Sequence, residues 1–264
     1  MQTITSKDNE LIKHIRKLKD KKYRDESNEY VVEGVKLVEE AVKENAKIKQ
    51  IIVCEDTTRT YEIPTHIMLE IAKYECISVS DKIFNIITQV TNPQGIMAII
   101  EKNAQNAKID YTQDIIVVLD DVQDPGNLGT IIRTAHAAGV NGIILTKGTV
   151  DIYNDKTIRS TMGSIFYVPI IYDNDLSFLM NLKSEGFSLV ATSLEESKNF
   201  FDEDLSGKVI LSVGNEGNGI SNEIFDLADK KVKIPMPGGA ESLNVGVATS
   251  IILFEKVRQR LCKN

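Results

Sequence analysis

Three glycine-containing loops carry polar side chains of types that could bind and orient a substrate. The first, DPGNLGTIIR, holds Asn127 and Arg133, and the second, SVGNEGNGIS, holds Glu216 among three glycines. The third, IPMPGGAESLNVG, places Asn244 after a turn rich in proline and glycine. Glycine permits positive φ and lets the backbone approach a ligand closely. Amide, guanidinium and carboxylate groups at such positions could orient a substrate and stabilise charge that develops during a reaction.

Each loop also has an ordinary structural explanation. Asn127 could cap the helix that follows the first loop, with Arg133 as a surface charge about two turns further on. The second loop could be a flexible turn with an incidental acid, and Ser242 could cap an ordinary terminal helix after the third. None of the loops matches the GxGxxG dinucleotide fingerprint or the Walker phosphate-binding loop, so a nucleotide-dependent oxidoreductase is poorly supported.

The stretches that flank these loops predict an α/β domain with a parallel sheet. IIVVLDDV, which precedes the first loop, is a continuous apolar run typical of a central strand that is covered on both faces. Five further runs repeat the pattern, with helical stretches at 127–138 and 176–185 between them: GIILTKG, FYVPIIY, FSLVATS, KVILSVGNE and KKVKIPM. In open parallel sheets, ligands bind beyond the carboxyl ends of the strands, which is where the three loops fall.

The first hundred residues predict a separate, smaller α/β domain. Helix-like and strand-like stretches alternate there, at 11–22, 30–32, 35–42, 48–56, 65–75 and 95–102. The polar segment 101–114 then predicts a linker, which divides the chain into domains 1–105 and 106–264.

The charge of this protein is unevenly distributed along the chain. Its 264 residues carry a formal net charge of −7, yet residues 7–24 hold eight basic side chains against three acidic ones. Such a stripe on an acidic protein could bind the phosphates of a nucleic acid, or could be a solvated helix face. The basic residues of the stripe are Lys7, Lys13, Arg16, Lys17, Lys19, Lys21, Lys22 and Arg24.

Cysteine and histidine usage points away from disulfides and metals. The three cysteines form no CxxC pair, and the three histidines are widely separated, so neither a disulfide framework nor a metal site is expected. The sequence shows neither the apolar core of a signal peptide nor a run near the roughly 18 apolar residues of a membrane span. We therefore expect a cytoplasmic protein with reduced thiols.

Together and in this order, the three loops resemble the motifs of the SpoU branch of the SPOUT RNA ribose 2′-O-methyltransferases. The family patterns Asn-x-Gly-x-x-x-Arg, Gly-x-Glu-x-x-Gly, and Ile-Pro-Met followed by Ser-Leu-Asn-Val are all met. They fall at Asn127, Gly129 and Arg133, at Gly214, Glu216 and Gly219, and at 234–236 and 242–245. RSTMGSIFYVP, from Arg159, resembles the Ser/Gly-rich stretch of the family, and the likeness covers roughly residues 115–260. VVEGVKLVEEA and TNPQGIMAII resemble the L30e-like substrate-binding domain that precedes the catalytic domain in many members.

The resemblance implies a SPOUT α/β-knot domain with a deep trefoil knot, S-adenosylmethionine (AdoMet) as the methyl donor and a homodimer that completes the site. It implies catalytic roles for Asn127, Arg133, Glu216 and Asn244. It places the cofactor against Thr192, Gly214, Asn215, Glu216, Gly219, Ile234, Met236, Ser242, Leu243 and Asn244. The basic stripe and the Arg159 segment add expected RNA contacts at Lys13, Arg16, Lys17, Lys21, Lys22, Arg24 and Arg159.

The implied reaction moves a methyl group from a sulfonium to a ribose 2′-hydroxyl. That hydroxyl attacks only when its proton is removed or its developing charge is stabilised. A guanidinium stays protonated at neutral pH, so Arg133 is better suited to holding a phosphate or stabilising the nascent alkoxide than to acting as a base. Because of the extra N-terminal domain, we expect ribosomal RNA as the substrate. The alternatives are a tRNA methyltransferase and a non-catalytic RNA-binding protein.

Overall fold

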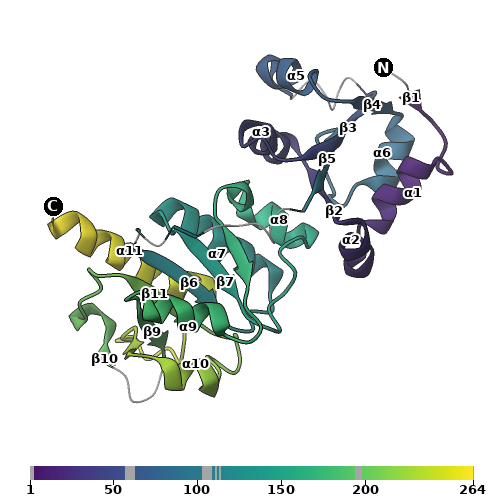
Figure 1. Ribbon diagram of the computed structural model, residues 1–264. Helices are drawn as coiled ribbons and strands as arrows, with labels where there is room; N and C mark the ends of the chain where they lie inside the picture. The colour runs from purple at the N-terminus through teal and green to yellow at the C-terminus, as the bar shows by residue number, and fades with distance from the viewer. Residues whose placement is uncertain are drawn as a thin grey trace. The chain divides into compact units, whose positions relative to one another are not determined.

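The apolar runs of the second half form a seven-stranded sheet in the computed structural model (Figure 1). The structure describes residues 3–56, 63–102, 109–110, 112, 114–193 and 198–263. Within these residues, neighbouring strands of this sheet all pair in parallel, in the order β10-β12-β9-β11-β6-β7-β8. The strands are β6 (Ile115–Leu119), β7 (Gly142–Leu145), β8 (Ile170–Tyr172), β9 (Ser188–Thr192), β10 (Lys198–Asn199), β11 (Val209–Val213) and β12 (Lys230–Lys233). The predicted α/β class with a parallel sheet is confirmed.

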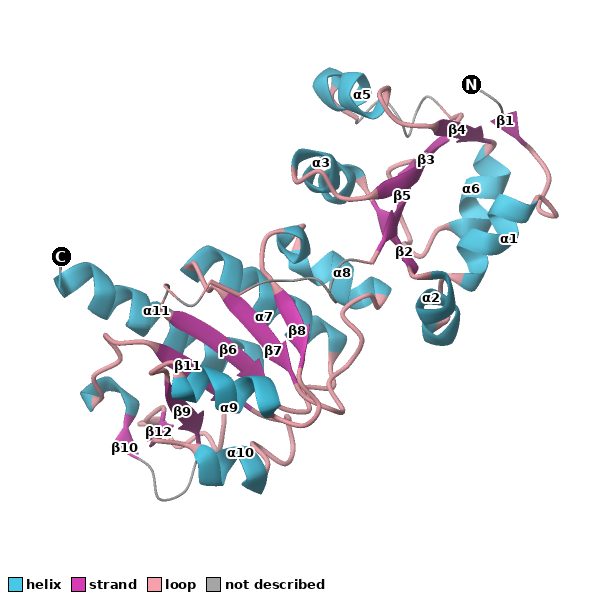
Figure 2. Ribbon diagram, in the orientation of Figure 1, coloured by secondary structure: helices cyan, strands magenta, loops and turns pink. Residues whose placement is uncertain are grey.

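Helices cover both faces of the parallel sheet (Figure 2). After β8, at one edge of the sheet, the chain crosses back to β9 on the other side of β6. The helices that follow, α9 and α10, lie on the opposite face of the sheet from α7. On one face, α9 and α10 bury Leu179, Leu182 and Ile224 against β6, β7, β9 and β11. On the other face, α7 packs along α11. The elements are α7 (Pro125–Ala138), α9 (Ser177–Ser184), the short 3-10 helix η3 (Phe200–Asp202), α10 (Asn222–Leu227) and α11 (Val245–Lys263).

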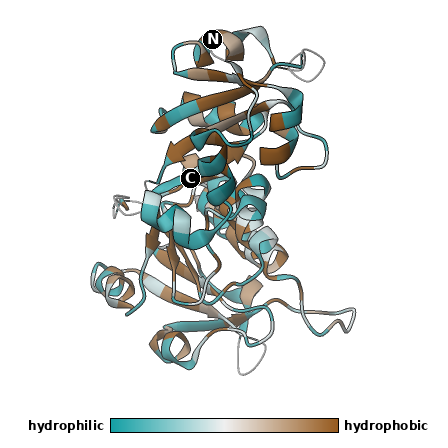
Figure 3. Ribbon diagram, turned by 90° about the vertical axis from the view of Figure 1, so that its right-hand side faces the viewer, coloured by the Kyte–Doolittle hydropathy of each residue, from teal (hydrophilic) through white to brown (hydrophobic). Residues whose placement is uncertain are grey.

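Burial on both faces explains why β6 is apolar at every position and does not alternate. All five residues of Ile115–Leu119 are fully buried. Figure 3 colours the ribbon by hydropathy and shows brown, hydrophobic stretches on strands of both units. Burying such a side chain contributes about 1.5–3 kcal/mol each. A fully buried central strand therefore anchors residues 120–123, which lead into the first loop.

The first hundred residues form a mixed five-stranded sheet in the order β1-β4-β3-β5-β2. Its apolar core gathers residues such as Ile12, Ile15, Phe84 and Met97 from α1, α6 and β5. The strands are β1 (Thr3–Ile4), β2 (Glu29–Glu33), β3 (Ile48–Cys54), β4 (Cys76–Val79) and β5 (Ile96–Glu101). The helices are α1 (Glu10–Lys17), α2 (Lys21–Ser27), α3 (Val35–Lys43), α5 (Thr65–Ile71) and α6 (Asp81–Ile87). The sequence did not predict β1, β4 and α6.

The predicted helix over residues 11–22 is wrong, because the chain breaks into two helices there. α1 ends at Lys17 and α2 begins at Lys21. Asp20 explains the break, since its side chain accepts a hydrogen bond from Tyr23 N (3.1 Å) and caps α2. The basic stripe is therefore not one helix face: Lys13, Arg16 and Lys17 lie on α1, whereas Lys21, Lys22 and Arg24 lie on α2.

The chain forms two compact units, Met1–Asn103 with Tyr153–Phe166, and Ala104–Ile152 with Tyr167–Asn264. The sequence assigned Tyr153–Phe166 to the second domain. In the structure α8 (Asp155–Thr161) and the 3-10 helix η2 (Ser164–Phe166) belong to the first unit, where the rings of Tyr30 and Tyr153 lie 4.5 Å apart. Packing between residues so distant in sequence leaves no periodic signal. The expected boundary near residue 105, and most of the expected linker 101–114, lie outside the described residues. The trefoil knot is not tested by the strand order and stays a prediction.

Candidate active site

The first loop enters α7 through Asp124, not through Asn127 as the capping explanation supposed. The Asp124 side chain accepts a hydrogen bond from Asn127 N (2.8 Å), and Pro125 stands at the first helical position. Proline suits that position because its φ is already helical and it has no N–H to satisfy. The Asn127 side chain is therefore not used as a cap.

Asn127 instead joins the three loops through one chain of hydrogen bonds. Its Nδ2 donates to Glu216 Oε1 (2.9 Å), and its Oδ1 accepts from Asn244 Nδ2 (2.8 Å). Asn244 Oδ1 accepts in turn from Gly246 N (2.9 Å) and Val247 N (3.3 Å), so Asn244 caps α11 and the predicted cap at Ser242 is wrong. Each amide is held in one orientation, because its donor and acceptor ends have different partners.

Glu216 receives three hydrogen bonds from the first loop and holds it in place. Besides Asn127 Nδ2, the backbone N–H groups of Gln123 and Asp124 donate to its carboxylate at 3.2 Å each. Partial burial acts to raise the pKa of Glu216, but the hydrogen bonds from Asn127 and the backbone outweigh it and lower the pKa below 4.5. A carboxylate so engaged stays ionised at neutral pH and is poorly suited to take a proton from a substrate.

A cavity of about 570 Å³ opens beside this chain, at the carboxyl ends of β9, β11 and β12. Its size is that of an ordinary small-molecule site. All ten residues expected to bind the cofactor line it: Thr192, Gly214, Asn215, Glu216, Gly219, Ile234, Met236, Ser242, Leu243 and Asn244. Eight further lining residues were not expected: Ser193, Val213, Gly217, Val232, Lys233, Glu241, Val245 and Ala248. Six of them lie directly next to an expected residue, Val232 lies two residues before Ile234, and Ala248 lies one helical turn after Asn244. Extending the expected segments by two residues, and by one turn into α11, would have found them.

Two glycines shape the wall of the cavity. Gly219 has φ of 72°, which favours glycine, and its backbone pairs with Asn215 in both directions at 2.9 Å. A Cβ built on Gly214 would lie 2.1 Å from Gly219 O, so no larger residue fits there without movement. By contrast, a Cβ on Gly238 or Gly239 would meet nothing within 4 Å, and neither residue lines the cavity.

Arg133 is exposed on α7 and lies apart from the Glu216–Asn127–Asn244 chain. At 3.6 residues and 5.4 Å per turn, it lies about 9 Å further along the helix than Asn127 and points in a direction roughly 120° away. The structure therefore joins three of the four expected catalytic residues by hydrogen bonds, and Arg133 is not among them.

Three of the expected RNA-contacting residues lie around one basic hollow of α1. Lys13, Arg16 and Lys17 line it together with Lys19 and Ile86, and its volume is about 510 Å³. Lys13 also contacts Glu10 at 2.8 Å on the same helix. Among the residues that line this hollow there is no acid.

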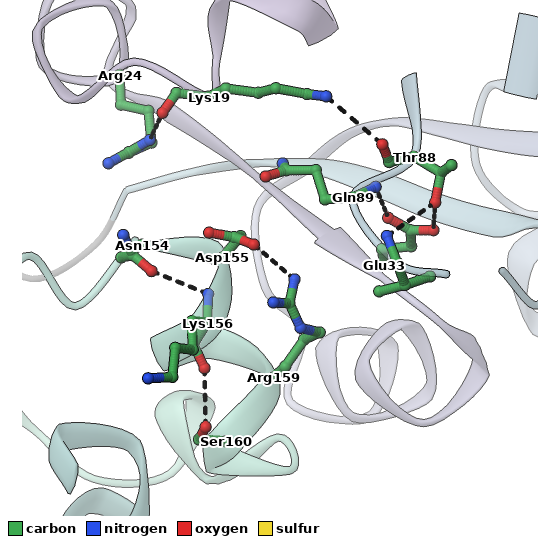
Figure 4. A network of polar contacts seen from close by, with 11 residues as sticks. Lys19, Arg24, Glu33, Thr88, Gln89, Asn154, Asp155, Lys156, Arg159 and Ser160 are labelled. Carbon is green, nitrogen blue, oxygen red and sulfur yellow. Dashed lines mark hydrogen bonds and ion pairs between the residues drawn. The ribbon is translucent and has the colours of Figure 1, made fainter. Parts of the chain in front are cut away.

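The other expected RNA contacts are placed differently. Arg24 is buried, and its Nη1 donates to the carbonyls of Leu18 (2.9 Å) and Lys19 (2.7 Å), so it braces the α1–α2 turn (Figure 4). Because the guanidinium is bound to main-chain carbonyls, only 5% of Arg24 is exposed, which leaves little of it for a contact with RNA. Lys21 and Lys22 are exposed on α2.

Arg159 lies on α8 and is bound to its own helix. Its Nη1 donates to Asp155 Oδ2 at 2.6 Å, as Figure 4 shows. Nearby, Glu33 accepts from Thr88 Oγ1 and from Gln89 N (3.0 Å), and burial raises its pKa against the effect of these hydrogen bonds. The positive charge of Arg159 acts to lower the pKa of Glu33. Arg159 therefore interacts with acidic groups of its own unit, whether or not it also contacts RNA.

No described helix is long and apolar enough to cross a membrane. Likewise, the described part of the chain contains no cluster of three or more His, Cys, Asp or Glu side chains suited to a metal ion.

Comparison with known proteins gives consistent matches over both units. The SpoU rRNA methylase family matches residues 114–254, and the MRM3-like substrate binding domain matches residues 9–98. The 23S rRNA (guanosine(2553)-2′-O)-methyltransferase RlmP of Bacillus subtilis is 36% identical over 254 residues, 96% of this chain and 98% of that protein. The AdoMet-bound rRNA methyltransferase from Sinorhizobium meliloti, a crystal structure, matches with a TM-score of 0.84 at 36% identity over 97% of each chain. The tRNA (guanosine(18)-2′-O)-methyltransferase of Aquifex aeolicus is 41% identical over 151 residues, 56% of this chain and 71% of that protein.

Proposed function

This chain belongs to the SpoU rRNA methylase family, and from that premise we propose that it methylates a ribose 2′-hydroxyl of 23S rRNA with AdoMet as the methyl donor. The observation that carries the proposal is the cavity lined by all ten expected cofactor residues, beside the hydrogen-bonded chain that joins the three motif loops. We propose that the protein acts in the cytoplasm.

The cavity suits AdoMet in shape and in charge. The close approach of Gly214 to Gly219 O folds the second loop tightly along one wall of the cavity. Met236 and Leu243 supply apolar surface, and the carboxylates of Glu216 and Glu241 supply negative charge suited to a sulfonium. When bound, AdoMet supplies an electrophilic methyl group.

The chain's own residues then orient the ribose hydroxyl. Each primary amide nitrogen carries two protons, and Asn127 Nδ2 and Asn244 Nδ2 each use one within the described structure. The second proton of each is available to the hydroxyl oxygen or a neighbouring phosphate. Glu216 fixes this geometry and is not the base, because hydrogen bonding lowers its pKa.

We propose further that a second copy of the chain completes the site. Arg133 is exposed and turned away from the Asn127 side of α7, so it is placed to serve a partner rather than its own loops. The same unit leaves Val247, Phe254 and Leu261 exposed on α11. Their spacing of seven residues forms an apolar stripe of the kind that helices bury against one another. A homodimer would cover the stripe and bring Arg133 to the partner's substrate.

The basic hollow of Lys13, Arg16, Lys17 and Lys19 would bind the phosphate backbone of the RNA. It lies within the region that matches a substrate-binding domain. The tRNA methyltransferase that resembles this chain matches little more than half of it, whereas RlmP matches 96%. The presence of the N-terminal unit therefore favours ribosomal RNA over tRNA.

Methyl transfer from labelled AdoMet to rRNA and tRNA from cells lacking the gene tests the proposal. We expect label at one ribose of 23S rRNA. The position can be mapped because 2′-O-methylation makes the phosphodiester bond that follows the ribose resistant to cleavage by alkali. Label in tRNA alone would support the tRNA alternative. A chain that binds RNA but shows no calorimetric binding of AdoMet would be a non-catalytic RNA-binding protein.

A further inference from the structure

Two aspartates that directly follow β6 hold the second loop by both of its ends, although neither lines the cavity. Asp120 holds the far end. Its Oδ2 accepts from Ser221 N at 2.6 Å, and its Oδ1 accepts from Thr146 Oγ1 at 2.9 Å. Only 6% of Asp120 is exposed, so water cannot easily replace these bonds.

Asp121 holds the near end of the same loop. Asn215 Nδ2 donates both to its backbone carbonyl (3.0 Å) and to its Oδ2 (3.1 Å). Asn215 Oδ1 accepts from Gly217 N (2.9 Å) and Asn218 N (3.0 Å), so the whole amide of Asn215 is used within the protein. Although Asn215 lines the cavity, its side chain acts on the loop and not on a ligand.

Asp121 makes its contact with Asn215 from a backbone conformation that most residues other than glycine disfavour. Its φ of 56° lies in the left-handed region, which Asp and Asn tolerate better than most residues. Asp121 N donates to Thr146 Oγ1 at 3.2 Å, so the same threonine hydroxyl contacts both aspartates. The two aspartates, Thr146 and the ends of the second loop thus form one connected cluster.

We propose that Asp120 and Asp121 are positioning residues that set the affinity for AdoMet by holding the loop 214–221 in its binding conformation. The inference rests on the proposed function, since it assumes that AdoMet occupies the cavity. Three glycines give this loop an unusually large conformational entropy when it is free. A loop that is already ordered does not lose that entropy on binding, so the clamp raises affinity without touching the ligand.

The test measures AdoMet binding by calorimetry and steady-state kinetics in Asp120→Ala and Asp120→Asn. We expect the alanine variant to weaken the Kd and raise the KM for AdoMet at least tenfold, while kcat at saturating AdoMet falls less than threefold. An asparagine side chain is isosteric with aspartate and can still accept from Ser221 N, so Asp120→Asn should recover most of the affinity. Unchanged Kd in a folded Asp120→Ala protein would overturn the inference.

Asp173→Ala is the matched control. Asp173 follows β8 of the same sheet, is 4% exposed and accepts from Leu179 N at 2.8 Å, but it holds α9 and not the loop. Its removal should lower the melting temperature and leave the Kd for AdoMet unchanged. Equal losses of affinity in both alanine variants would mean a general effect of destabilisation and would contradict a positioning role.

If Asp120→Ala fails to fold, the less buried Asp121 decides the matter. Asp121→Gly removes the carboxylate and keeps the left-handed backbone, whereas Asp121→Asn keeps an oxygen for Asn215 Nδ2. Weaker AdoMet binding in the glycine variant alone supports the clamp, and equal affinity in both overturns it. A wild-type chain without affinity for AdoMet would instead refute the proposed function itself.

Discussion

Replacing Asn127 by aspartate should make methyl transfer depend on pH in a way that replacement by alanine does not. Asn127 Nδ2 lies 2.9 Å from Glu216 Oε1, so Asn127→Asp sets a second carboxylate against the first. At this distance two unit charges repel by about 1.4 kcal/mol in bulk water and by about 6 kcal/mol at an effective dielectric constant of 20. Glu216 is exposed, so we take the lower figure as the expected minimum.

A repulsion of about 1.4 kcal/mol corresponds to about one pKa unit. The substitution also removes a hydrogen bond that lowers the pKa of Glu216, whose ordinary value is 4.5. The carboxyl pair should therefore take up its shared proton at a higher pH than an isolated glutamate would. Once protonated, it can form the hydrogen bond that Asn127 made, so function should return as the pH falls through this raised pKa. Asn127→Ala has no group to protonate and should not recover.

The assay is kcat/KM for methyl transfer between pH 8 and pH 5.5, with wild type and Asn127→Ala measured in parallel. Dividing the aspartate profile by the alanine profile removes effects of pH on RNA and on the rest of the enzyme. We expect this ratio to rise several-fold as the pH falls. A flat ratio, or one that falls, would show that Asn127 and Glu216 are not in contact during the reaction.

Three further predictions address the other parts of the site. The Arg133→Ala protein should fold and bind AdoMet but lose most methyl transfer. Mixing it with the Asn127→Ala protein should restore activity in heterodimers, because one of their two sites would have both residues intact; a mixture as inactive as its components would argue against a shared site. Gly214→Ala should weaken AdoMet binding at least tenfold by calorimetry, because its Cβ would lie 2.1 Å from a backbone oxygen of the same loop, and wild-type affinity would show that the loop relaxes freely. Replacing Lys17 and Lys19 by glutamine should weaken the salt dependence of RNA binding: the slope of log K against log salt concentration should become shallower by roughly one unit or less per lost phosphate contact. The affinity for AdoMet should not change, and an unaltered slope would mean that the hollow is only a solvated surface.

The sequence alone determined the local features of this protein. The run Ile115–Leu119 has to be a strand buried on both faces, because only such a position hides five consecutive apolar side chains. The glycines of the second loop predicted positions that permit positive φ, and Gly219 takes positive φ. Placing the loops at the carboxyl ends of parallel strands predicted that they meet, and all ten expected cofactor residues line one cavity.

Only the tertiary structure decided which groups each polar side chain binds. Asn127 could be a cap or a ligand by sequence, and it proved to be the link between Glu216 and Asn244, 89 and 117 positions away. By sequence, Arg24 could not be distinguished from the basic residues around it. In the structure it is buried, and its guanidinium donates a hydrogen bond to the carbonyl of Leu18. A sequence pattern reports which backbone conformation and which degree of burial a residue favours, but not its hydrogen-bond partners. The partners of Asn127 depend on how strands distant in sequence are ordered in the sheet, because that order brings the three loops together. The partners of Arg24 are only five and six residues away, and they depend on how the chain turns between α1 and α2.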